Sequence, residues 1–231
     1  MNIKILNLFK GARKAEGLTV IIDVFRAFST ACYIYQNGAE LIIPIGELDL
    51  AYKLKENNSE IILIGEREGK ILEGFDHGNS PSELKDIDFT GKVVVLTTSS
   101  GTQGINQAQK ADEILTGSFV NLKATVDYIK NQNPEQVSLV CMGKGGKRRA
   151  EEDILCARAI KETLMGSSPD FKAIKRKLRR TAGRRFFDPK KCWSPEEDFH
   201  LCLEVNKFNF VLKAEKEAGN LIFLKNIIYK G

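Results

Sequence analysis

The sequence is poor in the side chains that build zinc sites and disulfide frameworks. It has two histidines and five cysteines among 231 residues, and no two cysteines form a Cys-x-x-Cys pair. An odd, scattered set of cysteines does not suit a disulfide scaffold, and a zinc site needs closely spaced ligands. Any metal ion must then be held mainly by oxygen, which favours Mg²⁺ or a similarly hard cation.

Long apolar runs and targeting signals are also lacking. No stretch approaches the roughly 20 apolar residues that cross a bilayer, and residues 1–6 do not have the anatomy of a signal peptide. Unpaired cysteines fit a reducing compartment. We therefore expect a cytoplasmic protein without a membrane partner.

The positive charge is modest but uneven. The formal net charge is +5, and residues 172–185 carry eight basic side chains and no acidic one. Such a run can attract nucleic acid. However, Phe171, Ile174 and Leu178 recur at helical spacing through it, so a solvated helix with one buried stripe is the favoured interpretation. Nucleic acid is not the expected partner.

An internal repeat organises the first part of the chain. Residues 20–69 can be laid over residues 93–146, and each copy reads as strand, loop, helix, strand, helix, strand. This βαβαβ pattern predicts an α/β fold, because right-handed crossovers make such strands largely parallel and place their functional loops on one edge.

The C-terminal part has a different character. Residues 194–197 read Ser-Pro-Glu-Glu, which predicts an N-cap and a helix running to about Val205. Residues 209–213 and 221–225 then form a predicted hairpin around Gly219-Asn220. We expect a duplicated catalytic core over 1–168 and a helical and hairpin part over 169–231 that packs on the core instead of folding independently.

Acid, base and hydroxyl groups follow the first strand of the first copy. Asp23, Arg26, Ser29 and Thr30 come directly after an apolar run, and ligands of open α/β sheets bind at such strand ends. An Asp and an Arg within one turn can hold a metal ion and an anionic oxygen side by side, which suggests phosphate chemistry. A plain helix start would explain the two hydroxyls, but not the Asp and the Arg.

The equivalent loop of the second copy is rich in hydroxyls. Five of the six residues in Thr97–Thr102 are Ser or Thr. Their hydroxyl and backbone N–H groups can cradle an oxyanion. A helix cap is the alternative, but a cap needs only one such residue.

Two further segments offer ligands in the first copy. Glu66 and Arg67 end its third strand and can supply a second metal ligand and a second anion clamp, unless they form a solvated turn. Asn79 and Ser80 lie in a polar loop that is too long for a minimal connection. Ser80 also fits a helix N-cap, whereas Asn79 has no such explanation.

In the second copy, the glycine-rich and basic loop 143–149 precedes Glu152 and Asp153. Basic residues on such a loop suit a highly charged substrate. Acidic residues at a helix start also stabilise the helix dipole, but one or two suffice for that. Glu152 or Asp153 is therefore a candidate metal ligand.

These segments together resemble the family of 2-phosphosulfolactate phosphatases. Six signatures run in series across residues 18–160, which makes the resemblance highly specific. They are Asp23-Val24-x-Arg26-Ala27-x-Ser29-Thr30, Gly65-Glu66-Arg67-x-Gly69, Gly74-Phe75-Asp76-x-Gly78-Asn79-Ser80-Pro81, Thr97-Thr98 with Gly101-Thr102, Gly117-Ser118-Phe119-x-Asn121, and Glu152-Asp153.

The resemblance implies a three-layer α/β/α fold with a mostly parallel mixed sheet. It also implies Mg²⁺-dependent hydrolysis of 2-phospho-3-sulfolactate to 3-sulfolactate and phosphate, a reaction on the archaeal route to coenzyme M. Two departures concern the substrate pocket: Ser100 stands where many members have Asn, and loop 143–149 is unusually basic. A related phosphorylated 2-hydroxy acid is therefore also a candidate substrate.

The resemblance also assigns roles to residues. The expected catalytic residues are Asp23, Arg26 and Glu66, and the expected Mg²⁺ ligands are Asp23, Glu66, Glu152 and Asp153. The expected substrate-binding residues are Arg26, Ser29, Thr30, Arg67, Asn79, Ser80, Thr98, Ser99, Ser100, Gly101, Thr102, Ser118 and Asn121.

Several alternatives stay open at this point. Asp23 can act as a metal ligand or as a nucleophile that forms an aspartyl phosphate. Either Glu152 or Asp153 can hold the metal, and a homo-oligomer is compatible with the sequence. A protein that binds a small anion or nucleic acid without turnover is the alternative to an enzyme.

Overall fold

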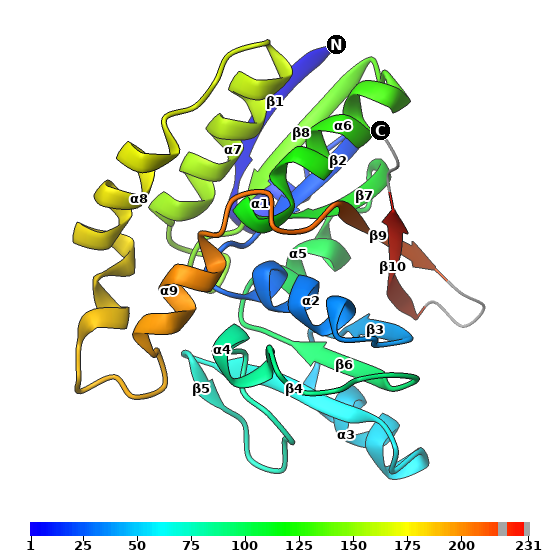
Figure 1. Ribbon diagram of the computed structural model, residues 1–231. Helices are drawn as coiled ribbons and strands as arrows, with labels where there is room; N and C mark the ends of the chain where they lie inside the picture. The colour runs from blue at the N-terminus through cyan, green and yellow to red at the C-terminus, as the bar shows by residue number, and fades with distance from the viewer. Residues whose placement is uncertain (217–220, 229–231) are drawn as a thin grey trace.

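The computed structural model describes residues 1–216 and 221–228 (Figure 1). The strands are β1 (Asn2–Asn7), β2 (Gly17–Ile22), β3 (Leu41–Pro44), β4 (Ile62–Arg67), β5 (Lys70–Ile71), β6 (Val93–Thr97), β7 (Ala111–Gly117), β8 (Gln136–Cys141), β9 (Phe210–Lys216) and β10 (Ile222–Ile228). The helices are α1 (Leu8–Ala12), α2 (Ala27–Gln36), α3 (Leu48–Asn57), α4 (Pro81–Leu84), α5 (Gly101–Gln107), α6 (Leu122–Gln132), α7 (Glu151–Leu164), α8 (Phe171–Arg180) and α9 (Glu196–Cys202), with 3₁₀ turns η1 (Phe119–Asn121) and η2 (Ala182–Phe187). In the described ranges, no helix is both long and apolar enough for a membrane crossing.

The strands form one sheet in the order β1-β8-β2-β7-β9-β10-β3-β6-β4-β5. Two parallel groups, β1-β8-β2-β7 and β3-β6-β4, make up its two halves. The antiparallel hairpin β9-β10 joins them through β7 and β3, and β5 adds an antiparallel edge to β4. The predicted α/β fold with a mostly parallel mixed sheet is confirmed.

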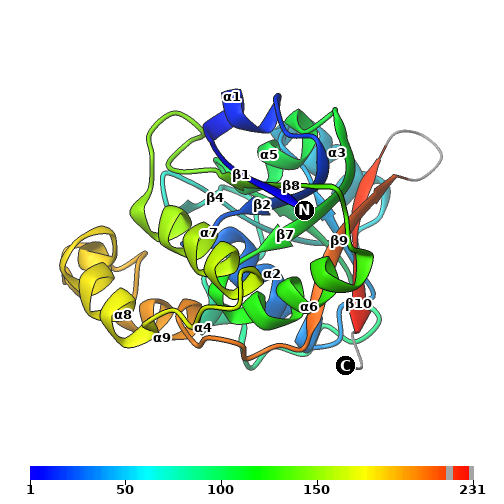
Figure 2. The same cartoon turned by 90° about the horizontal axis from the view of Figure 1, so that it is seen from above.

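Side-chain alternation along the strands divides the core into layers. On β2, Ile21 points into a central cluster, whereas Val20 points into a second cluster with α6 and α7. On β6, Leu96 joins the central cluster and Val95 a third one beside α3. Helices α2 and α5 therefore lie between the two halves of the sheet, with outer helices on the far faces (Figures 1 and 2).

The order of the strands does not keep the two copies of the repeat apart. The repeat predicts largely parallel strands, and it does not specify which strands are neighbours. In the structure, β2, the first strand of the first copy, lies between β7 and β8 of the second copy. Conversely, β6 lies between β3 and β4 of the first copy. The halves of the sheet thus exchange their central strands, and the duplication itself remains a prediction from the sequence.

The C-terminal part enters both the sheet and the core. Strands β9 and β10 pair over Phe210–Ile228, while the predicted turn at Gly219-Asn220 lies outside the described residues. Leu178, Phe186 and Phe199 are buried in the cluster that also contains β2. Helix α9 begins after Pro195 and ends at Cys202, earlier than predicted, and Ser194 does not cap it.

A chain truncated to residues 1–168 should therefore fail to fold cooperatively. It would uncover the edges of β7 and β3 and remove Leu178, Phe186 and Phe199 from the core. Each such side chain contributes about 1.5–3 kcal/mol, against a total stability of about 5–15 kcal/mol for a typical domain. Thermal unfolding followed by circular dichroism measures this, and a sharp transition near that of the full chain would contradict it.

Candidate active site

The carboxyl ends of strands from both halves of the sheet meet in one cleft of about 590 Å³. β2 and β8 reach it from one half, and β4 and β6 from the other. Nine predicted site residues line it: Asp23, Arg26, Glu66, Asn79, Thr98, Ser99, Ser100, Glu152 and Asp153. The cleft is therefore shared between the two copies of the predicted repeat.

Asp23 lies at the centre of this arrangement. Its Oδ1 accepts a long hydrogen bond of 3.4 Å from the backbone N–H of Ala27 at the start of α2. A Cβ placed on Gly101 would lie 3.0 Å from Asp23 Oδ2 and 3.1 Å from the ring of Phe28. Gly101 is thus a close-packing position, because only a residue without a side chain lets α5 approach Asp23 this closely.

Two of the four buried carboxylates have both oxygens occupied by backbone donors. Glu66 accepts from the N–H groups of Ser99 at 2.8 Å and Gly69 at 2.6 Å. Asp153 accepts from the N–H groups of Val24 at 2.9 Å and Gly143 at 2.7 Å. Each carboxylate ties together loops that follow different strands, so this pair fixes the shape of the cleft.

The other two carboxylates have open oxygens. Glu152 is 3% exposed and its Oε2 has no hydrogen-bond partner, while Asp23 has only the long contact with Ala27. A buried carboxylate oxygen without a donor is unfavourable unless a cation compensates it. Asp23 and Glu152 are therefore the carboxylates best able to accept a metal ion.

Burial and crowding of like charges perturb these acids. Burial raises the pKa of Asp23 to about 7, and the charges of Glu66 and Glu152 act in the same direction. Burial also raises the pKa of Glu152, and it raises the pKa of Asp153 well above its usual range with help from Glu152 and Asp23. Perturbed acids in a cleft are typical of functional sites.

Over residues 1–216 and 221–228, no set of three His, Cys, Asp or Glu side chains is arranged to hold a metal on its own. The four predicted ligands reach the same cleft, but they do not form a closed cage. This arrangement suits Mg²⁺, which usually takes one or two carboxylates and completes its shell with waters and substrate phosphates.

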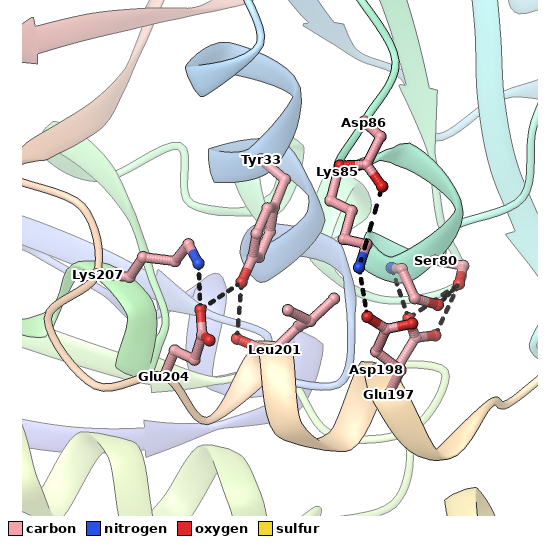
Figure 3. Close-up of polar contacts among 10 residues, drawn as sticks. Tyr33, Ser80, Lys85, Asp86, Glu197, Asp198, Leu201, Glu204 and Lys207 are labelled. Carbon is pink, nitrogen blue, oxygen red and sulfur yellow. Dashed lines mark hydrogen bonds and ion pairs between the residues drawn. The ribbon is translucent and has the colours of Figure 1, made fainter.

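The Arg26 side chain forms a buried ion pair with Asp198. Its Nη1 donates to Asp198, which is fully buried on α9, and its Nη2 donates to the carbonyl of Gly69 at 3.1 Å. Asp198 also accepts from the Ser80 hydroxyl at 2.9 Å (Figure 3). Ser80 thus points toward α9 and is not among the residues that line the cleft. Asp198 is not among the predicted site residues, because it lies 172 residues from Arg26 along the chain and no local pattern connects the two.

Contacts between α2, α4 and α9 hold this ion pair in place. Figure 3 shows Lys85, which directly follows α4, facing Glu197. It also shows Tyr33 of α2 donating to the carbonyl of Leu201 at 3.2 Å. The Tyr33 hydroxyl also bonds to Glu204. Helix α9 is therefore attached to the first copy of the repeat beside the cleft.

Other predicted substrate-binding residues lie behind the cleft. The Arg67 guanidinium donates to the carbonyls of Glu66 and Gly46 and to the Thr97 hydroxyl. The Ser29 and Ser118 hydroxyls bond to each other at 2.6 Å. The structure does not bring Ser29, Thr30, Arg67, Gly101, Thr102, Ser118 or Asn121 into the lining of the cleft.

These residues still shape the loops that carry the cleft. Asn121 Oδ1 accepts from the backbone N–H of Ser118 at 3.1 Å. Thr98 and Thr102 exchange hydrogen bonds between their backbone N–H and hydroxyl groups. The Ser100 hydroxyl donates to the carbonyl of Gly143 at 2.7 Å, which links the loops after β6 and β8.

Four basic residues outside the predicted set also line the cleft. Lys144, Lys147 and Arg148 come from the glycine loop after β8 and are exposed, whereas Arg185 comes from η2 and is largely buried. The basic run does form the predicted helix α8 with Leu178 buried. Its last residue is instead turned into the cleft, because η2 changes the direction of the chain after α8.

Asp198→Asn should markedly destabilise the protein, because it leaves the buried Arg26 without a counter-charge. Breaking a buried ion pair in this way typically costs about 3–5 kcal/mol. Glu197→Gln on the same helix is the matched control, since the exposed Glu197–Lys85 pair should contribute at most about 1 kcal/mol. Urea unfolding compares the two, and equal losses would contradict the assignment.

The metal-free protein should lose stability as the pH rises from about 4 to about 7. The folded pKa of Asp23 is about 7 against 3.8 for the free side chain, so between these values the folded state holds a proton that the unfolded state has released. The loss from this group is at most about 4 kcal/mol. Thermal unfolding in a chelating buffer measures it, and Asp23→Asn should flatten the profile. An equally steep profile in the variant would contradict this origin.

Comparison with known proteins agrees with this geometry. A family model described as 2-phosphosulpholactate phosphatase matches residues 4–217. A protein from Caldicellulosiruptor saccharolyticus is 39% identical over 159 residues, which cover 67% of this chain and 65% of the relative, just under two thirds of its length. Proteins from Caldanaerobacter subterraneus subsp. tengcongensis and Bacillus subtilis are 33% and 28% identical, over 86% and 91% of this chain and 88% and 92% of their own. All three are named "Probable 2-phosphosulfolactate phosphatase". Because this family model spans residues 4–217, which is most of the chain, the chain belongs to the 2-phosphosulfolactate phosphatase family.

Proposed function

We propose that the protein is a Mg²⁺-dependent phosphatase that hydrolyses 2-phospho-3-sulfolactate, or a related phosphorylated 2-hydroxy acid, to the 2-hydroxy acid and phosphate. One observation carries the proposal: two buried carboxylates with open oxygens, Asp23 and Glu152, share a cleft with several cationic side chains. Metal-assisted phosphate chemistry needs both kinds of group. The names of the relatives supply the substrate. We also propose that the reaction takes place in the cytoplasm.

Asp23 and Glu152 would hold the ion through their open oxygens. The ion supplies charge neutralisation at the phosphate oxygens as the ester bond breaks. Glu66 and Asp153 hold the surrounding loops, because both oxygens of each already accept backbone N–H groups. The number of open carboxylates agrees with the few protein ligands that Mg²⁺ usually takes.

The phosphate oxygens would meet polar groups from the second sheet half. Thr98, Ser99 and Asn79 line that side of the cleft, and the Oδ1 atom of the buried Asn79 has no partner. This oxygen is a hydrogen-bond acceptor, so it can bind a water on the metal or a hydroxyl group. These contacts would orient the phosphate beside the two open carboxylates.

The non-reacting acid groups of the substrate would lie toward the glycine loop. Lys144, Lys147 and Arg148 line the cleft and are exposed. None of the three forms an ion pair within the residues that the structure describes. Free cations at this rim suit a sulfonate and a carboxylate. A substrate with about four negative charges would thus be matched along the whole cleft.

A substrate panel tests the reaction. Phosphorylated 2-hydroxy acids with and without a sulfonate are incubated with Mg²⁺ or with a chelator, and phosphate release is measured. We expect metal-dependent release, fastest with the sulfonate present. A failure to release phosphate from any compound in the presence of Mg²⁺ would overturn the proposed function and favour anion binding without turnover.

Variants locate the chemistry. Asp23→Asn and Glu152→Gln should each lower kcat/KM by at least about 1,000-fold, because each removes one of the two open carboxylates that would hold the metal. Glu151→Gln is the matched control, since this neighbour faces Lys177 on the surface. Near-normal turnover by Asp23→Asn would exclude both of its candidate roles, as ligand and as nucleophile.

A further inference from the structure

Two of the three arginines that line the cleft, Arg26 and Arg185, come from its inner part, and their surroundings differ. The Arg26 guanidinium is neutralised by the buried Asp198. Arg185 makes no ion pair with any carboxylate in the described part of the chain. Its Nη2 donates to the carbonyl of Phe25 at 3.1 Å, and its buried Nε has no partner at all. Within the described residues, Arg185 therefore keeps free donors in the cleft and has no carboxylate in direct contact.

A guanidinium that lines a cleft without forming an ion pair favours the binding of an anion there. Burying a charge without a partner is unfavourable, and a planar guanidinium binds phosphate-type oxygens through two parallel hydrogen bonds. Asp23 and Glu152 line the same cleft and feel the charge of Arg185, which acts to lower the pKa of each. When these carboxylates hold a metal ion, the ion offsets much of their negative charge, so an anionic ligand can supply the charge that Arg185 lacks.

The side chain is also held rigidly. The Arg185 guanidinium lies 4.8 Å from the centre of the Phe186 ring. Phe186 packs edge-on against Phe25 with ring centres 5.0 Å apart, and Phe25 itself lines the cleft. A Cβ on Gly183 would lie 2.4 Å from the Phe199 ring, so η2 lies tightly against this aromatic cluster. Such support is typical of a residue that must present its charge in one position.

We propose that Arg185 binds the phosphoryl oxygens of the substrate beside Asp23 and Glu152, whereas Arg26 is a positioning residue that Asp198 holds. This inference rests on the proposed function for the identity of the substrate. It does not rest on turnover, because an oxyanion site at Arg185 binds inorganic phosphate whether or not an ester is hydrolysed. The C-terminal part of the chain then supplies a substrate-binding residue to the repeats.

Calorimetric titration of the full-length protein with inorganic phosphate, in the presence of Mg²⁺, tests the proposal. Arg185→Gln should raise the Kd for phosphate by about 10- to 100-fold, the usual range for losing charged hydrogen bonds. Arg185→Lys keeps the charge but loses the planar fork, so it should show a smaller increase. Arg184→Gln is the matched control, because its exposed neighbouring side chain should leave the Kd within twofold.

Chemical rescue separates binding from support of the fold. Arg185→Ala should regain phosphate binding on addition of millimolar guanidinium ion, which a purely structural role would not produce. If Arg185→Gln has the wild-type melting temperature and binds phosphate within twofold of wild type, the inference is overturned. If Arg185→Ala is folded but guanidinium does not restore binding, it is overturned as well.

The two proposals can fail separately. A wild-type protein that binds phosphate through Arg185 but releases none from the substrate panel would defeat the proposed reaction and leave this site standing. A protein that hydrolyses the substrate while Arg185→Gln retains the wild-type kcat, KM and inhibition by phosphate would defeat only the role of Arg185.

Discussion

Four buried carboxylates in one cleft can coexist only if each is supplied with hydrogen-bond donors or with a cation. The protein meets this constraint in two ways. Backbone N–H groups from loops on both sides occupy Glu66 and Asp153, and these contacts fix the relative positions of the strand ends. Asp23 and Glu152 are left with open oxygens, and under the proposed function a metal ion would relieve the crowding of their charges. Glu66 and Asp153 thus hold the loops in place, while Asp23 and Glu152 keep oxygens that face the cleft without a strong hydrogen bond.

The helices, strands and acidic residues could be read from the sequence because their signals are local. An apolar run followed by Asp23, or a glycine loop followed by Glu152, indicates a strand end or a helix start without knowledge of the partner strand. The exchange of β2 and β6 could not be predicted, because these strands pair with distant segments: Leu41 pairs with Val93, 52 residues away, and Leu18 pairs with Val137, 119 residues away. Asp198 and Arg185 were missed for the same reason. A charge pattern predicts a solvated face, and it does not show that η2 turns the last arginine inward.

The hydroxyl motifs illustrate a different limit. Ser29 and Ser118 sit in two separate signatures, and they meet as a buried pair. A residue can therefore belong to a family signature because it shapes a loop. The motif alone does not distinguish such a residue from one whose side chain faces the ligand. Gly101 is a second example: it does not line the cleft, but its lack of a side chain lets α5 approach Asp23 closely. Side-chain direction decides between these roles, and the pattern of residue types does not contain it.

The exchanged central strands have a consequence for how the chain is made. During synthesis, β2 emerges early, but its neighbours β7 and β8 end only at Gly117 and Cys141. More than 100 further residues must leave the ribosome before this apolar strand has both partners, which is several seconds at about 5–20 residues per second. Non-local pairing of this type also slows folding, because loop closure must precede the contacts that stabilise it. The nascent chain thus carries this apolar strand without both of its neighbours for about half of its synthesis, since 119 of the 231 residues lie between Ile22 and the end of β8 at Cys141. The side of the cleft that β2 and β8 form is therefore completed only after β8 has emerged.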